Sequence, residues 1–160
     1  ETKNVGILAT NGTVSSNSYP IEIEKFFPDI KVFQEACPMW VPLVENGEYQ
    51  DDGADFFVKR DLALLFAQSE KIDTIILGCT HYPLLINKIR QYLPNHVQVL
   101  SQGEVVAHSL QDYLQRHDEI KSRCSQQQQR QLLTTDNEEN FNRLAGVFLG
   151  QTVAATKISL

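Results

Sequence analysis

Short apolar runs alternate with amphipathic stretches along most of the chain. Four runs of aliphatic and β-branched residues predict buried strands, at Asn4–Thr10, Ile30–Ala36, Asp73–Leu77 and Val97–Ser101. Between and after them, apolar residues recur at helical spacing, which predicts helices over residues 14–27 (interrupted at Pro20), 51–69, 83–93 and around 106–114. Strands that alternate with helices in this way are typical of a parallel, layered α/β sheet.

The pattern weakens after the fourth strand. The polar run Cys124–Gln131, CSQQQQRQ, predicts an exposed connection. It is followed by a short strand near Leu132–Thr134, a helix built on Phe141, Leu144, Ala145 and Phe148, and a last strand near Val153–Ile158. These elements are too few to close a second core, so we expect them to extend the first sheet or to pair with something outside this chain.

Composition narrows the functional classes. With 160 residues and 42% hydrophobic side chains, the chain can bury a proper core. A formal net charge of −6 argues against a nucleic-acid or anionic-membrane surface. Apolar runs are far below the roughly 18 residues of a membrane span. Three widely spaced cysteines suit reduced thiols, which favours a cytoplasmic location.

Two strand ends carry similar polar groups. Thr10–Thr13 follows the first strand, and Gly78–His81 follows the third. In open α/β sheets ligands bind outside the carboxyl ends of strands, where helix N-termini favour anions, so we expect both strand ends to favour an anion such as a carboxylate. Thr13 or Ser15 is expected to cap the first helix and Thr80 the second.

The residues alone leave several interpretations of Cys79 open. It is either a packed, inert thiol or a reactive thiol at a helix start, with His81 close enough to accept its proton. A metal site is disfavoured, because Cys-x-His has no close second pair of ligands. Cys37 reads as a packing residue and Cys124 as an incidental surface thiol. Glu45, which ends an apolar helix, is either exposed or lines a cleft.

Three segments together resemble a known family. ILATNGTVSSNSY, EACPMWVPLVENG and above all IILGCTHYPLL are similar to the corresponding segments of glutamate racemase. The similarity runs in order from Val5 to Leu85 and continues more weakly to the end of the chain. Related aspartate racemases usually have Glu where this chain has His81, which favours glutamate as the substrate.

The resemblance implies a mechanism without cofactor or metal. Two cysteines of opposite protonation state flank the substrate and move protons at Cα. Cys79 matches the second of these thiols, and His81 matches the histidine that assists it. The positions that match substrate-binding residues, or in the last case an acidic residue of less certain role, are Thr10, Thr13, Thr80 and Glu45. The implied product is D-glutamate for peptidoglycan, and hence for cell shape.

The chain also departs from the family. The family's chains are longer, and they carry Asp-Ser-Gly and Cys-Asn-Thr motifs that this sequence lacks. We therefore expect a C-terminal portion of a two-lobed racemase. Residues 1–103 would form one complete lobe, a three-layer sandwich on a parallel sheet, and residues 104–160 would finish the other lobe. Such a chain has half an active site and is expected to be inactive alone.

The resemblance also implies the partners. They are glutamate and the missing N-terminal half, with a homodimer left open and no nucleic acid or membrane. Two alternatives remain at this stage. One is an aspartate or related amino-acid racemase, and the other is a noncatalytic lobe that binds an acidic ligand or a protein.

Overall fold

A computed structural model describes residues 2–125, 127 and 130–160, and it divides into the units Glu1–His108 and Ser109–Leu160. The first unit is built on four parallel strands in the order β2-β1-β3-β4. Their bounds are β1 Asn4–Ala9, β2 Lys31–Ala36, β3 Thr74–Leu77 and β4 Gln98–Ser101. All four predicted strands are confirmed, with ends within one residue of those expected.

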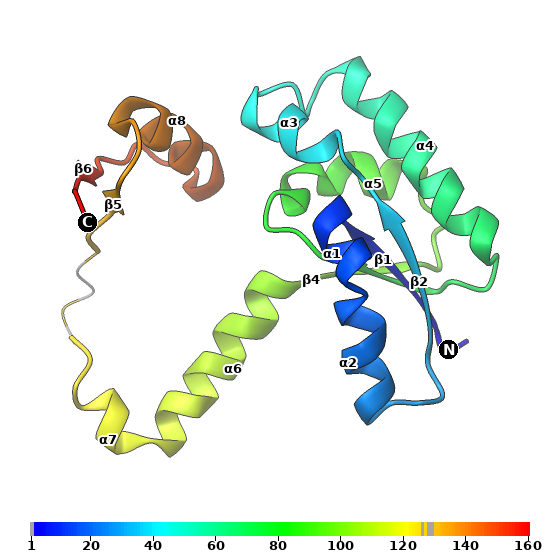
Figure 1. Ribbon diagram of the computed structural model, residues 1–160, viewed down its shortest axis with the longest axis horizontal. Helices are drawn as coiled ribbons and strands as arrows, with labels where there is room; N and C mark the ends of the chain where they lie inside the picture. The colour runs from blue at the N-terminus through cyan, green and yellow to red at the C-terminus, as the bar shows by residue number, and fades with distance from the viewer. Residues whose placement is uncertain (1, 126, 128–129) are drawn as a thin grey trace. The chain divides into compact units, whose positions relative to one another are not determined.

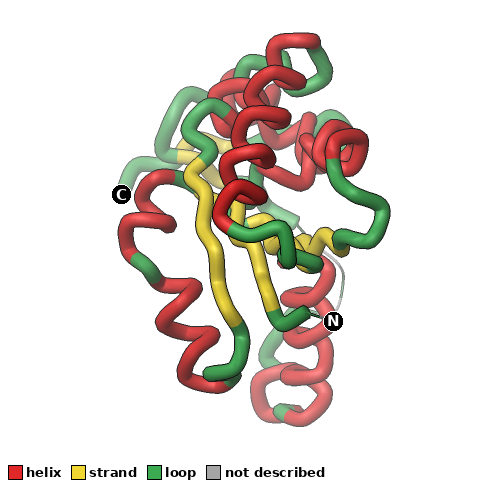
Figure 2. The backbone as a smooth tube through the Cα atoms, turned by 90° about the vertical axis from the view of Figure 1, so that its right-hand side faces the viewer, coloured by secondary structure: helices red, strands yellow, loops and turns green. Residues whose placement is uncertain are grey.

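Helices cover both faces of this sheet (Figure 1). Their bounds are α1 Asn11–Ser16, α2 Ser18–Phe26, α3 Trp40–Glu45, α4 Asp52–Gln68, the 3₁₀ helix η1 Tyr82–Leu85 and α5 Ile86–Tyr92. The connection from β1 leads outward to β2, and the connection from β3 leads the opposite way to β4. The strand order therefore reverses between β1 and β3, and open α/β sheets usually bind ligands beside the strand ends at such a reversal. The strands run side by side in Figure 2.

The main core lies between the sheet and helices α4 and α5. Side chains from the sheet, α4, η1 and α5 are fully or almost fully buried there, among them Leu8, Val58, Leu65, Ile75, Leu77, Leu85 and Ile89. Gly6 of β1 lets α4 approach closely, because a Cβ atom at this position would lie 2.7 Å from Leu65 Cδ2. On the opposite face, Tyr19 of α2 packs beside Gly78, at the end of β3. This is the predicted three-layer α/β arrangement.

The predicted helix over residues 14–27 is two helices, and the break is not at Pro20. Asn17 adopts a left-handed conformation, with φ 54° and ψ 23°, between α1 and α2. Asparagine tolerates this region better than most residues. Gln34 of β2 donates a 2.9 Å hydrogen bond to Asn17 Oδ1. Pro20 lies in the first turn of α2, where its missing N–H costs no helical hydrogen bond.

The second unit, described by itself, is small. It contains the end of α6 Gln102–Arg116, followed by α7 Asp118–Lys121, β5 Leu133–Thr134, α8 Glu138–Leu149 and β6 Thr156–Lys157. β5 and β6 pair in parallel. The short helix α7 was not predicted. Part of the predicted glutamine-rich loop, residues 126 and 128–129, lies outside the described residues. Within the described part of this unit only Thr134 is buried, so the unit has little core of its own.

None of the described helices is long and apolar enough to span a bilayer.

Candidate active site

The polar groups after β1 and β3 lie at adjacent strand ends. Leu8 pairs with Leu77, and the Gly78 N–H donates a 2.8 Å hydrogen bond to the Leu8 carbonyl. Thr10 and Cys79, two residues after this pair, therefore leave the sheet side by side, on strands about 4.8 Å apart. The register of the sheet thus brings together two strand ends that the sequence singled out separately.

Cys79 is partly buried and lies next to His81. The Cys79 Sγ atom is 3.8 Å from His81 Nδ1, and Thr80 Oγ1 is 3.4 Å from the same nitrogen. His81 Nε2 lies 3.2 Å from Glu45 Oε1, at the end of α3. An ionised Glu45 favours the proton on Nε2, and Nδ1 then presents its lone pair to the thiol. The three side chains form an ordered array of carboxylate, imidazole and thiol, as in other sites that activate a nucleophile or base.

The structure thus places the Glu45 carboxylate beside the His81 imidazole, a contact that the sequence did not suggest. The side chain of His81 is 22% exposed and that of Glu45 is 46% exposed, so both can be reached from solvent. The segments are 36 residues apart in sequence, and only the packing of α3 against η1 brings them together.

The threonines of the first strand end also lie as a pair. Thr10 Oγ1 and Thr13 Oγ1 are 3.2 Å apart, and both side chains are half-buried. The capping predictions were wrong in detail. Thr10 itself holds the N-cap position of α1 and His81 that of η1, and neither makes a side-chain cap hydrogen bond. The hydroxyls of Thr13 and Thr80 therefore do not serve as helix caps.

A pocket of about 360 Å³ opens beside Cys79. It is lined by the end of β3 and its loop, together with Pro83, Ser101, Gln102 and Gly103. Ser101 ends β4, Gln102 and Gly103 begin α6, and none of the three was singled out from the sequence. They form a third strand end followed by a helix start, the same pattern that drew attention to the first two. Thr10, Thr13, Glu45 and His81 are not among the residues that line this pocket.

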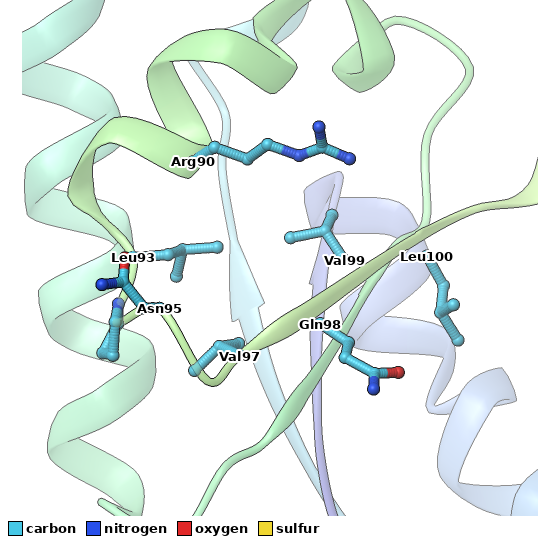
Figure 3. A pocket seen from close by; sticks show the side chains of 8 residues that line it. Arg90, Leu93, Asn95, Val97, Gln98, Val99 and Leu100 are labelled. Atoms are coloured by element: carbon cyan, nitrogen blue, oxygen red, sulfur yellow. The ribbon is translucent and has the colours of Figure 1, made fainter.

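A second pocket, of about 500 Å³, lies beside the edge strand β4 (Figure 3). Arg90 is the one charged residue among those that line it, with Leu93, Val97, Val99 and Leu100 supplying apolar surface. It contains no thiol, imidazole or carboxylate, so it offers no acid or base for proton transfer.

The other cysteines have different surroundings. Cys37 is fully buried at the end of β2. Burial first, and then the nearby carboxyl groups of Asp61 and Glu35, hold the pKa of the Cys37 thiol far above its usual value. Its packing role is confirmed. Cys124 is exposed in the second unit. Among the described residues, no three His, Cys, Asp or Glu side chains gather in a way that could hold a metal ion.

Comparison with known proteins gives one consistent result. No family model matches the chain. It is 36% identical over 151 residues to glutamate racemase 2 of Caldanaerobacter subterraneus subsp. tengcongensis, which covers 94% of this chain and 56% of the relative. It is 37% identical over 153 residues to glutamate racemase of Synechococcus sp., and the match covers 94% of this chain and 57% of that relative.

Solved structures agree with the sequence matches. A glutamate racemase isoform from Bacillus anthracis superposes with a TM-score of 0.86 at 30% identity, covering 100% of this chain and 59% of that protein. Glutamate racemase from Francisella tularensis, solved in complex with D-glutamate, superposes with a TM-score of 0.84 at 25% identity, covering 99% and 57%. The chain therefore spans little more than half the length of the proteins that it matches.

Proposed function

On the premise that this chain belongs to the glutamate racemase family by sequence similarity and fold, we propose that it carries one half of a glutamate racemase active site. The observation that supports this most directly is the contact of Cys79 with His81, backed by Glu45. The proposed reaction interconverts L- and D-glutamate without a cofactor, in the cytoplasm, and supplies D-glutamate for peptidoglycan.

In the proposed mechanism, Cys79 works on one face of the substrate Cα. His81 Nδ1 accepts the Cys79 proton, and Glu45 stabilises the resulting imidazolium through Nε2–H. The thiolate then removes the Cα proton, and the bonding electrons remain on the substrate as a carbanion. In the reverse direction the Cys79 thiol returns a proton to the same face. Thr10, Thr13 and Thr80 are proposed to bind the substrate through their hydroxyls.

A second thiol must act on the opposite face. Cys37 is buried in the core, so it is not suited to this role. The match covers only 56–59% of the related racemases, and we expect the second thiol to come from an N-terminal half that corresponds to the rest of their length. The proposed partners are therefore glutamate and this N-terminal half, while a homodimer stays an open prediction.

Deuterium incorporation at Cα provides the test. D- and L-glutamate are offered separately in D₂O to the 160-residue chain, alone and with an N-terminal racemase half that carries the other cysteine. Exchange of one enantiomer by the chain alone, or racemisation in the mixture, supports the proposal when Cys79→Ser removes it. Silence in both settings would contradict it and leave a noncatalytic binding lobe as the better interpretation. Preference for aspartate over glutamate in the same assay would reassign the substrate.

A further inference from the structure

Tyr82 follows the proposed proton-transfer residues directly, yet its hydroxyl points away into the core. The side chain is fully buried, and Oη donates a 3.0 Å hydrogen bond to the Cys37 carbonyl. Burial is also the main reason why the pKa of this phenol lies well above its usual value, so the hydroxyl keeps its proton and acts as a donor. The reaction described above makes no use of this group.

The acceptor of this hydrogen bond joins three elements. Cys37 directly follows β2, and its carbonyl also accepts a 3.3 Å hydrogen bond from the N–H of Trp40, the residue that begins α3. The Tyr82 ring packs against the Trp40 indole, with centroids 4.7 Å apart and planes inclined by 57°. One carbonyl and one aromatic pair thus tie η1 to the start of α3.

The same two elements hold the two partners of the ion pair. Glu45 ends α3, five residues after its start at Trp40, and His81 immediately precedes Tyr82. The Tyr82 N–H in turn donates to the Cys79 carbonyl at 3.3 Å, which closes the turn that contains Thr80 and His81. The relative position of Tyr82 and Trp40 therefore sets where the backbones of His81 and Glu45 lie, and so helps to set the 3.2 Å separation of His81 Nε2 and Glu45 Oε1.

We propose that Tyr82 is a positioning residue, whose hydroxyl and ring fix the turn of Cys79 and His81 against α3 so that Glu45 holds the histidine. Tyr82 touches neither substrate nor thiol in this role. It acts by setting the orientation of the imidazole, with Nε2 toward Glu45 and Nδ1 toward Cys79. The proposal rests on the proton-transfer roles assigned above, but its test requires no racemisation.

The test measures alkylation of Cys79 by iodoacetamide in the full 160-residue chain, by peptide mass spectrometry. Cys124, in the other unit, is the internal reference. Tyr82→Phe retains the ring and removes only the hydrogen-bond donor. We expect it to slow alkylation of Cys79 about fivefold relative to alkylation of Cys124, a factor in the range of one lost hydrogen bond. In ¹⁵N spectra of this variant, recorded at a pH above the ordinary titration range of histidine, the chemical shifts of the two His81 ring nitrogens should become more alike, because neither tautomer is then fixed.

A double-variant comparison separates positioning from general destabilisation. Glu45→Gln should slow Cys79 as Tyr82→Phe does, and the combined variant should be no slower than Glu45→Gln alone, because both act through the same histidine. Tyr92→Phe is the matched control, since its hydroxyl interacts with Asp55 rather than with the turn, and it should leave Cys79 unchanged.

Two results would overturn the proposal. One is an unchanged alkylation rate and an unchanged His81 spectrum in Tyr82→Phe. The other is a double variant whose fold-reduction in Cys79 alkylation rate equals the product of the fold-reductions in the two single variants. If Tyr82→Phe does not fold, Trp40→Phe decides the matter. It shrinks the ring that Tyr82 packs against, and it should slow Cys79 in the same direction, whereas a normal rate would refute the positioning role.

Discussion

The three thiols of this chain share a chemistry but not an environment. Cys37 is sealed beneath α3 with carboxyl groups nearby, and these surroundings disfavour its thiolate. Cys79 is partly buried at a strand end with an imidazole beside it, and Cys124 is exposed. Position in the fold therefore decides which thiol can react.

The first prediction follows from this difference. In the native chain, iodoacetamide should label Cys79 and Cys124 and leave Cys37 unmodified, because alkylation requires an accessible thiolate. Peptide mapping after a short exposure measures all three at once. Cys37 should react only after denaturant is added, and its modification in the folded chain would contradict the packing described here.

The second prediction concerns the proton-transfer array. In the racemase reassembled from both halves, Cys79→Ser should reduce Cα exchange by about 100-fold or more, as expected when an acid or base is lost. Glu45→Gln should reduce it less, because the imidazole remains and only its stabilising partner is weakened. Isotope incorporation followed by mass spectrometry gives both rates. Equal losses in the two variants would show that Glu45 does more than hold His81.

Asp61 supports a third prediction. This carboxylate is buried in α4 beside Trp40, with the Arg60 guanidinium 2.8 Å away, and its Oδ2 atom has no hydrogen-bond partner among the described residues. Burial raises the pKa of Asp61 above its ordinary 3.8, although contact with Arg60 opposes this shift. The folded chain therefore binds this proton more tightly than the unfolded chain does.

The sign of the pH effect follows from that difference. As pH rises from the ordinary aspartate value through the raised pKa, Asp61 should lower the free energy of unfolding, and above that window its effect is constant. Asp61→Asn cannot titrate, so the stability of wild type minus that of the variant should fall with pH across this window. Urea unfolding at a series of pH values measures it. A constant difference would mean that Asp61 has the same pKa in both states.

At the scale of elements, the alternation of apolar runs was enough to find the four strands and the long helix α4 of the first unit. It could not find the break at Asn17, because that depends on a left-handed backbone and on Gln34 from another strand. Nor could it place Glu45 beside His81. That contact is made by the packing of α3 on η1, a tertiary feature with no local sequence signal. Cys79, His81 and the threonines were identified from their motifs, but their geometry was not.

The close approach of β1 and α4 gives a fourth prediction. A methyl group at Gly6 would meet Leu65, which is fully buried and has little room to move, as well as Ile72. Gly6→Ala should therefore lower the free energy of unfolding by about 1–3 kcal/mol, the usual cost of overpacking. Gly53→Ala is the matched control, since nothing lies within 4 Å of that position in α4, and it should be neutral or stabilising by up to about 1 kcal/mol. Denaturant melts of both variants check the sign.

At the scale of the whole molecule, stability is unevenly distributed. The first unit has a sheet with a continuous core on one face, whereas the second pairs only two residues in each strand and buries little. Composition and pattern predicted this contrast, because the tail supplies too few apolar elements for a core. The assignment of residues 104–160 to a second lobe stays a prediction.

Hydrogen exchange tests this difference as a fifth prediction. Amides of β1 and β3 should exchange only through global unfolding of the first unit, while those of β5, β6 and α8 should exchange many times faster. Addition of the N-terminal half should slow the second group and leave the first unchanged. Equal protection in both units of the chain alone would show that the tail is stable without a partner.

The pairing of Leu8 with Leu77 also limits how this protein can evolve. One residue added to either strand would advance its end by about 3.3 Å and turn the following side chain to the other face of the sheet, so Thr10 and Cys79 would part. Substitutions within the strands spare this alignment, but insertions do not. Insertions and deletions among homologous chains should therefore occur mainly before the strands begin, as around residues 69–73 before β3. The number of residues between each strand and the threonine or cysteine that follows it should stay constant.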